Sequence, residues 1–204
     1  MQRITNSYGL VVCGGKSERM GSDKGMLTYH HKPQRYHAYD MLAHCCDRTF
    51  LSCNASQGSS VSKGYDVLPD APLYNEIGPM AALLTAFQKF PEKDFLFIGC
   101  DYPLLTSGEL NSFTNFCEGL TGAAAFYHQP FQIYEPLLAW YPHETYPTLL
   151  KQFDNKVYSL QHFLRRIEAA KYQPSDSESM RSIDSREGQN SVRVQLTTRG
   201  LTIE

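Results

Sequence analysis

The stretch "YGLVVCGGKSERMGSDKGML", residues 8–27, joins an apolar run to a glycine-rich, basic segment. Its letters GKS match the end of a phosphate-binding P-loop, whose full pattern is G-x-x-x-x-G-K-[ST]. The position where the first glycine of that pattern should stand is Leu10. The Rossmann pattern G-x-G-x-x-G also fails, because Gly14 and Gly15 are adjacent and Gly21 lies too far along the chain. The stretch therefore predicts a buried strand followed by a basic, glycine-rich loop of neither common type.

The composition is that of an ordinary globular protein. The 204 residues are 42% hydrophobic and 20% charged, which excludes a mainly disordered chain. The formal net charge is −2, so no overall bias favours nucleic acid or a membrane surface, and any anion binding has to be local. The first residues lack a signal-peptide layout and no apolar run approaches a membrane span, so we expect a cytoplasmic protein.

Six cysteines are spread along the chain without any C-x-x-C pair. They are Cys13, Cys45, Cys46, Cys53, Cys100 and Cys117. Free cysteine is a common small core residue, so we expect buried thiols rather than a zinc site or a disulfide framework.

Apolar runs alternate with segments of helical periodicity, which predicts an α/β sheet with helices on both faces. Strands are expected at residues 8–13, 49–53, 65–69, 94–100, 122–128 and 134–141. Helices are expected at residues 33–47, from the Gly78-Pro79 pair, from the capping-box pattern Thr106 to Glu109, and twice within residues 145–170. The polar residues 174–204 are interpreted as a loop followed by a weak element, "VRVQLTT", or a frayed tail.

Polar residues follow four of the expected strands directly or almost directly. The glycine-rich loop follows the first, and Asn54, Asp70 and Asp101 follow three others. Asn and Asp are also common turn formers, so each residue alone would favour a structural role. In open α/β sheets, however, ligands bind at the carboxyl ends of strands, near the point where strand order reverses. The shared position after strands therefore predicts that these residues converge in one crevice.

The residue types in this crevice suit a nucleoside triphosphate. Glycines let backbone N–H groups approach an oxyanion closely. Three cations lie in the same loop, namely Lys16, Arg19 and Lys24. Asp101 supplies a hard oxygen ligand of the kind that Mg²⁺ takes when it bridges substrate phosphates. The chemistry predicted is phosphoryl or nucleotidyl transfer, in which catalysis is mostly positioning and charge neutralisation.

Other residue pairs are less informative about chemistry. His30 and His31 could suggest a metal site, but adjacent residues of an extended chain point to opposite sides and no third ligand is nearby. We interpret them as surface or lid residues. Tyr36 and Tyr39 are interpreted as helix core rather than as a base-stacking pair.

Several motifs resemble those of one enzyme family. The first stretch resembles the signature L-A-G-G-x-S-x-R-M-G-x-D-K-x-L of nucleotidyltransferases related to molybdenum cofactor guanylyltransferase. Four later segments resemble further family motifs in the same order: "LSCNAS", "LPDAPLYNEIGPMAALLTAF", "FLFIGCDYPLLT" and "YEPLLAWY". The resemblance spans roughly residues 8–170, so it depends on several motifs rather than one.

The resemblance implies an activity and a fold. The family's enzyme transfers GMP from GTP to molybdopterin and releases pyrophosphate with the help of Mg²⁺. The implied fold is a three-layer, Rossmann-like α/β domain with a mixed, mostly parallel sheet. We expect one domain over residues 1–204, with a core at 7–172 and a polar C-terminal segment at 173–204. The implied partners are GTP, molybdopterin and proteins that deliver molybdopterin or mature molybdoenzymes, without nucleic acid or membrane.

The resemblance also implies roles for the signature residues. Val12, Cys13, Gly14 and Gly15 resemble the backbone segment that lies against the base and the phosphates. Cys13 stands where the family has Ala, and a small thiol should fit there.

Further roles come from the charged residues and from the later motifs. Arg19 and Lys24 resemble the cations that contact the triphosphate, so we expect them to act in catalysis. Asn54 and Asp70 match positions near the guanine and the ribose. Asp101 matches the Mg²⁺ ligand.

The C-terminal motif departs from the family. The family reads N-x-N-T-P-E-[DE]-L, and the best match here is "SIDSREGQ". In this alignment Asp184 replaces the second Asn and Arg186 replaces the Pro. Asp184 would then place a second carboxylate near the metal.

Two alternatives to guanylyl transfer remain open at this level. The first motif is also compatible with a cytidylyltransferase for the same cofactor or with a sugar-phosphate nucleotidyltransferase. The changed C-terminal motif permits a non-catalytic nucleotide-binding relative, because a fold does not by itself determine a function.

Overall fold

The computed structural model describes residues 4–13, 24–53, 58–183 and 186–198. The strands are β1 (Ser7–Val12), β2 (Arg48–Cys53), β3 (Val67–Pro69), β4 (Asp94–Gly99), β5 (Ala124–His128), β6 (Ile133–Tyr141) and β7 (Ala170–Tyr172). The α-helices are α1 (Gln34–Cys45), α3 (Met80–Lys89), α4 (Ser107–Cys117), α5 (Tyr146–Asp154), α6 (Leu160–Arg166) and α7 (Arg186–Thr198). Short 3₁₀ turns are η2 (Lys24–Met26), η3 (Pro72–Tyr74), η4 (Gln129–Phe131), η5 (His143–Thr145) and η6 (Ser177–Met180).

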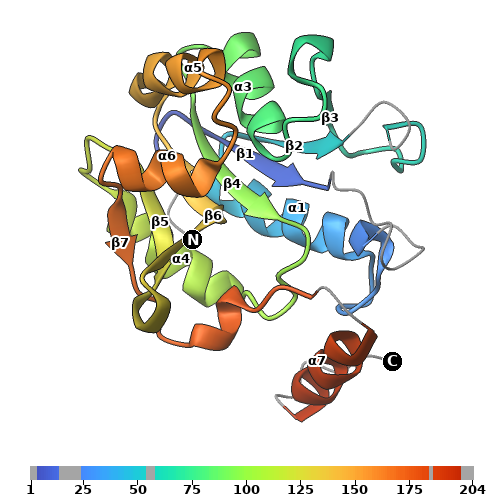
Figure 1. Cartoon of the computed structure of the whole chain (residues 1–204). Helices are drawn as coiled ribbons and strands as arrows, with labels where there is room; N and C mark the ends of the chain where they lie inside the picture. Colours follow the sequence, from blue (N-terminus) through green and yellow to red (C-terminus); the bar gives the residue numbers. More distant parts are fainter. Residues whose placement is uncertain (1–3, 14–23, 54–57, 184–185, 199–204) are drawn as a thin grey trace.

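The strands form one sheet in the order β3-β2-β1-β4-β6-β5-β7 (Figure 1). β1 lies between β2 and β4 and is parallel to both, so Val12 is level with Ser52 on one side and with Gly99 on the other. Among the described strands, β6 alone runs against the rest, because it is antiparallel to β4 and to β5. The expected mixed, mostly parallel sheet is confirmed.

Helices cover both faces of the sheet (Figure 1). One face packs α1 and α4 against alternate strand residues such as Val11 and Leu96. The opposite face packs α3, α5 and α6 against their neighbours, such as Leu10 and Phe97. This alternation follows from the period of two in a strand, and it explains why the central strands read as continuous apolar runs.

Local signals placed most of the helices correctly. Pro33 precedes α1, and the Thr106 side chain accepts the Glu109 backbone N–H at 3.1 Å at the start of α4. Only half of the capping box forms, because the Glu109 carboxylate bonds elsewhere. It accepts the Tyr172 hydroxyl at 2.5 Å and the Ser175 backbone N–H at 3.2 Å, which fastens the chain after β7 to α4. All six cysteines are buried and none forms a disulfide, as expected.

Two elements differ from the sequence-based expectation. β7, at Ala170–Tyr172, was not predicted and adds to the sheet edge beside β5. The segment "VRVQLTT" is not a frayed tail, because it forms the end of a helix, α7, which begins at Arg186 in what was expected to be a loop. Val192 and Leu196 are buried one helical turn apart against Tyr29 and Leu104, which gives this polar helix an apolar anchor. None of the helices in the described ranges is long and apolar enough to cross a membrane.

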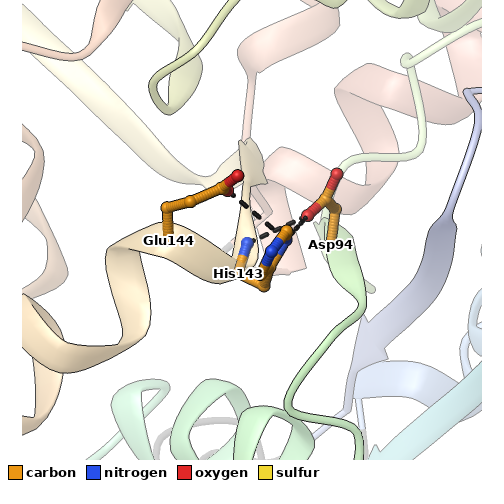
Figure 2. A group of neighbouring side chains, drawn as sticks. All are labelled: Asp94, His143 and Glu144. Carbon is orange, nitrogen blue, oxygen red and sulfur yellow. Dashed lines mark hydrogen bonds and ion pairs between the residues drawn. The ribbon is translucent and has the colours of Figure 1, made fainter.

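Asp94, His143 and Glu144 form a cluster at the edge of the sheet where β4 begins and the antiparallel β6 ends (Figure 2). One Asp94 oxygen lies 2.8 Å from Nδ1 of His143 and also accepts the His143 backbone N–H at 2.9 Å. The Glu144 carboxylate lies 3.3 Å from the same ring nitrogen. These contacts join the start of β4 to the end of β6. The hydrogen bond to Asp94 raises the pKa of His143, burial opposes the rise, and the negative charges of Glu144 and Asp94 add to it.

We predict that this cluster makes stability depend on pH through His143. The folded-state pKa of His143 is raised, so its contribution is fully present below the unfolded-state pKa and is lost as pH rises through the folded-state pKa. The melting temperature of wild type should therefore exceed that of His143→Gln by more at about pH 5.5 than at about pH 9.

The control is His44→Gln, because the exposed His44 ring bonds the backbone carbonyl of Asp40 instead of a carboxylate. An equal difference in melting temperature at both pH values would contradict the role assigned to His143.

Candidate active site

The carboxyl ends of four parallel strands bring the described site residues to one edge of the sheet. The Cys100 backbone N–H bonds the Val12 carbonyl at 3.1 Å, so the chain leaving β4 lies beside the chain leaving β1. The Cys13 N–H bonds the Ser52 carbonyl at 2.9 Å, which places the end of β2 on the other side. Val12, Cys13, Asp70 and Asp101 thus share the edge that the sequence predicted for them.

Asp70 is fixed next to the end of β2. Its backbone N–H bonds the Cys53 carbonyl at 3.4 Å, and one of its carboxylate oxygens accepts the Ser52 hydroxyl at 2.9 Å. Burial raises the pKa of Asp70, while the Ser52 hydrogen bond opposes the rise. The residue after it is also held, because the Ala71 N–H donates to Thr85 of α3 at 2.9 Å. Hydrogen bonds therefore fix Asp70 in place, and its carboxylate is a partly buried hydrogen-bond acceptor. A simple turn residue would be solvated instead.

Asp101 folds back over the end of β4, so that its carboxylate lies close to Gly99. A Cβ atom at Gly99 would lie 2.6 Å from Oδ1 of Asp101 and 2.9 Å from Cε2 of Tyr102. It would also lie 3.3 Å from Cβ of Leu137 in β6. Contacts under 3.0 Å are not tolerated without movement, so a methyl group at Gly99 would displace the Asp101 carboxylate or the Tyr102 ring.

The structure adds a residue that the sequence analysis did not single out. Glu135 enters this region from β6, where the Tyr102 hydroxyl and the Leu137 backbone N–H hydrogen-bond it. Burial raises the pKa of Glu135, the two hydrogen bonds oppose the rise, and the negative charge of Asp101 adds to it. A second carboxyl group therefore lies within electrostatic range of Asp101.

Glu135 lies at a point where the register between β5 and β6 shifts. The pairing of β5 with β6 shifts between Ala125, which is level with Ala139, and Phe126, which is level with Glu135. The residues between them on β6 bulge away from the ladder, and bulges commonly re-aim side chains near functional sites. The signal in the sequence was an acidic residue inside the otherwise apolar run "YEPLLAWY".

The two adjacent histidines lie differently from each other. Nε2 of His30 is 2.7 Å from the Pro103 carbonyl, just beyond Asp101, and the ring stacks on His37. The interpretation of His30 as a surface or lid residue is therefore wrong, because it is partly buried between two segments. His31 is exposed. Tyr36 is buried and stacks on Tyr65, as expected for helix core.

Several predicted site residues lie outside what the structure describes. They are Gly14, Gly15, Arg19, Asn54 and Asp184, together with Lys16 of the same loop. For Lys24 the backbone is described, and it begins η2. The roles assigned to these residues stay predictions. Their neighbours along the chain are placed, since Cys13 and Cys53 both lie at the carboxyl edge.

Two carboxylates at the carboxyl edge are of the chemical type that binds hard divalent cations. Carboxylate oxygens are the groups that Mg²⁺ takes in proteins, and Asp101 and Glu135 supply them here. In the part of the chain that the structure describes, the one compact group of three possible ligands is Asp94, His143 and Glu144. That group lies at the amino edge of the sheet, away from the crevice, and its atoms already pair with one another (Figure 2).

Comparisons with known proteins identify the family and the fold. A family model described as the MobA-like NTP transferase domain matches residues 9–171. The "Molybdenum cofactor biosynthesis bifunctional protein" of Synechocystis is 40% identical over 104 residues, which cover 50% of this chain and 29% of that protein. The "Probable molybdenum cofactor guanylyltransferase" of Flavobacterium johnsoniae is 22% identical over 192 residues, covering 92% of this chain and 96% of that protein.

A solved structure shows the same fold. The "Molybdopterin-guanine dinucleotide biosynthesis protein A" of Archaeoglobus fulgidus superposes with a TM-score of 0.74 at 18% identity, covering 94% of this chain and 99% of that one. The expected three-layer α/β nucleotidyltransferase fold is thereby confirmed. The family model extends from the first signature strand through β7, which is the region where the sequence motifs resemble the family. The chain belongs to the MobA-like NTP transferase domain family.

Proposed function

We propose that this chain transfers GMP from GTP to the terminal phosphate of molybdopterin and releases pyrophosphate. The observation that carries the proposal is the meeting of the signature strand with the Asp101 turn, where the Cys100 N–H bonds the Val12 carbonyl at 3.1 Å. A glycine-rich basic loop and a carboxylate at neighbouring strand ends suit a bound triphosphate. The names of the two relatives above, both in molybdenum cofactor biosynthesis, support the choice of acceptor.

The chemistry of this transfer needs no covalent enzyme intermediate. An oxygen of the molybdopterin phosphate attacks the α-phosphorus of GTP, and the bond from that phosphorus to the bridging oxygen of pyrophosphate breaks. Negative charge grows on the leaving pyrophosphate, so cations near the β- and γ-phosphates favour the transition state. We assign that work to Arg19 and Lys24, with Gly14 and Gly15 offering backbone N–H groups to the phosphates.

The remaining assignments follow from the same edge of the sheet. Asn54 and Asp70 are assigned to the nucleoside, because they follow β2 and β3 on the far side of the signature strand. Asp101 is assigned as ligand of a divalent metal, proposed to be Mg²⁺, with Glu135 as a neighbouring carboxylate. A bound Mg²⁺ would neutralise charge on the triphosphate. Asp184 is retained as a further carboxylate near this position.

A cytoplasmic location and the delivery proteins for molybdopterin remain parts of the same proposal. The absence of an overall basic charge favours small-molecule substrates over nucleic acid. Proteins that hand over molybdopterin or receive the product would bind near the carboxyl edge.

Pyrophosphate release tests the proposal most directly. The purified chain is incubated with Mg²⁺ and with GTP, CTP, UTP or ATP, each with and without molybdopterin. We expect release only with GTP and molybdopterin together. Release with CTP would identify the cytidylyl sister activity, and release with a sugar phosphate as acceptor would identify a sugar nucleotidyltransferase. Tight GTP binding without release would indicate a non-catalytic relative.

We predict that Asp101→Ala and Lys24→Ala each reduce turnover by about a hundredfold or more, because each removes a group that stabilises charge in the transition state. The measurement is the rate of pyrophosphate release at saturating GTP. Asp66→Ala is a matched control, since the exposed Asp66 pairs with Arg48 on the surface. Near-normal turnover in both site variants would contradict the assignment.

We predict that Gly99→Ala reduces turnover by about tenfold or more, because the added methyl group pushes the Asp101 carboxylate out of position. A loss of stability of about 1–3 kcal/mol should accompany it, as is usual for overpacking. Gly122→Ala is the control, since a Cβ there meets no atom within 4 Å. Unchanged turnover of a folded Gly99→Ala variant would show that Asp101 does not need this position.

A further inference from the structure

The turn that carries Asp101 is held by two segments distant in the sequence. The Asp101 carbonyl accepts the Ile183 backbone N–H at 3.1 Å. The Pro103 carbonyl lies 2.7 Å from Nε2 of His30. A carbonyl can only accept, so Nε2 carries the proton and the imidazole donates. The turn is therefore fixed from outside the strand that leads into it.

The segment that presents His30 begins at the end of the signature loop. It runs from η2, whose first residue is Lys24, into a tight turn closed by pairing of Thr28 with Pro33. His31 has a φ of 60°, a left-handed conformation that non-glycine residues rarely adopt. Because of this turn, the side chains of His30 and His31 differ in their surroundings: His30 is partly buried, while His31 is exposed.

A second histidine orients the first. The rings of His30 and His37 stack with centroids 4.0 Å apart and planes inclined by 16°. Burial lowers the pKa of both residues, in the case of His37 to about 4, which favours the neutral form in which the two rings stack without charge repulsion. Because His37 belongs to α1, the stack also fixes the imidazole of His30 against the body of the domain.

An apolar contact joins the same two segments beside the hydrogen bond from His30 to Pro103. Tyr29, next to His30, packs with Leu104, next to Pro103, in a small buried cluster that α7 covers. Apolar packing holds the two segments together but does not set their register, because it has no direction. A directional contact between them is the bond from His30 to Pro103.

We propose that His30 is a positioning residue for the transfer reaction, which fixes the segment beginning at Lys24 against the turn that carries Asp101. The inference rests on the proposed function, since Lys24 and Asp101 are the groups assigned to the triphosphate and its metal. His30 itself bonds a backbone carbonyl and is not assigned to the substrate. Its loss should loosen the turn and reduce kcat, because small displacements of charge-stabilising groups are costly in the transition state.

The test compares His30→Leu, which removes the donor, with His30→Gln, whose side-chain amide keeps an N–H donor at similar reach. His44→Leu is the matched control, because His44 is exposed on α1 and bonds the backbone of its own helix. Hydrogen exchange is followed in the peptide containing residues 100–106, where the Leu105 N–H bonds the Tyr102 carbonyl. Values of kcat and of KM for GTP are measured on the same preparations.

We expect exchange in this peptide to be about tenfold faster in His30→Leu than in wild type, as for loss of one hydrogen bond. The value of kcat should fall by about tenfold with a smaller change in KM, and His30→Gln should recover most of both losses. The control should match wild type. Wild-type exchange and kcat in His30→Leu, or a His30→Gln as impaired as His30→Leu, would overturn the proposal.

Failure of the proposed function would give different results from failure of the role proposed for His30. A wild-type chain that releases no pyrophosphate with any nucleotide would remove the transfer reaction, while the exchange measurement would still show whether His30 holds the turn. If His30→Leu does not fold, the comparison of His30→Gln with wild type decides, because unchanged exchange and kcat are expected of a retained donor.

Discussion

The parallel pairing of β1 with β2 on one side and β4 on the other is the constraint on which the rest of the structure depends. It brings three strand ends level, so that Val12 lies between Ser52 and Gly99. Every polar group that follows these strands must then emerge at one edge. The apolar character of β1 is the condition for this arrangement, since both of its faces are covered by helices. The loop after β1 can be basic and glycine-rich because the strand before it supplies the stability.

The reversal of β6 divides the edge into two kinds of environment. On the side of β1 to β3, parallel strands end side by side, and their last backbone groups pair with one another, as Cys13 does with Ser52. On the side of β6, a strand begins, and its first residues include Glu135 beside Tyr102. A carboxyl group inside a sheet is costly unless it is hydrogen-bonded, and Glu135 meets that condition through Tyr102 and Leu137.

The features that sequence reasoning predicted are those set by neighbouring residues. Asp70 and Asp101 could be placed because each follows a recognisable apolar strand, and Thr106 because its cap bonds a residue three positions along. Glu135 could not be placed, since its surroundings depend on the pairing of β6 with β4, for which the chain has to fold first. β7 pairs with β5 across more than forty residues of chain and has only three residues to signal it. The helical spacing of Val192 and Leu196 was present in the sequence, but the polar composition around them outweighed it.

The hairpin that joins β5 to β6 lies outside the pairing of the central strands. Because β6 is antiparallel, this hairpin, with η4 at its tip, projects from the carboxyl edge and connects neither β1 nor β4. Longer or shorter versions of it would extend over solvent without changing the pairing of the central strands. The length of this hairpin can therefore change without moving the ends of β1, β2 and β4, after which the signature loop and the Asp101 turn begin.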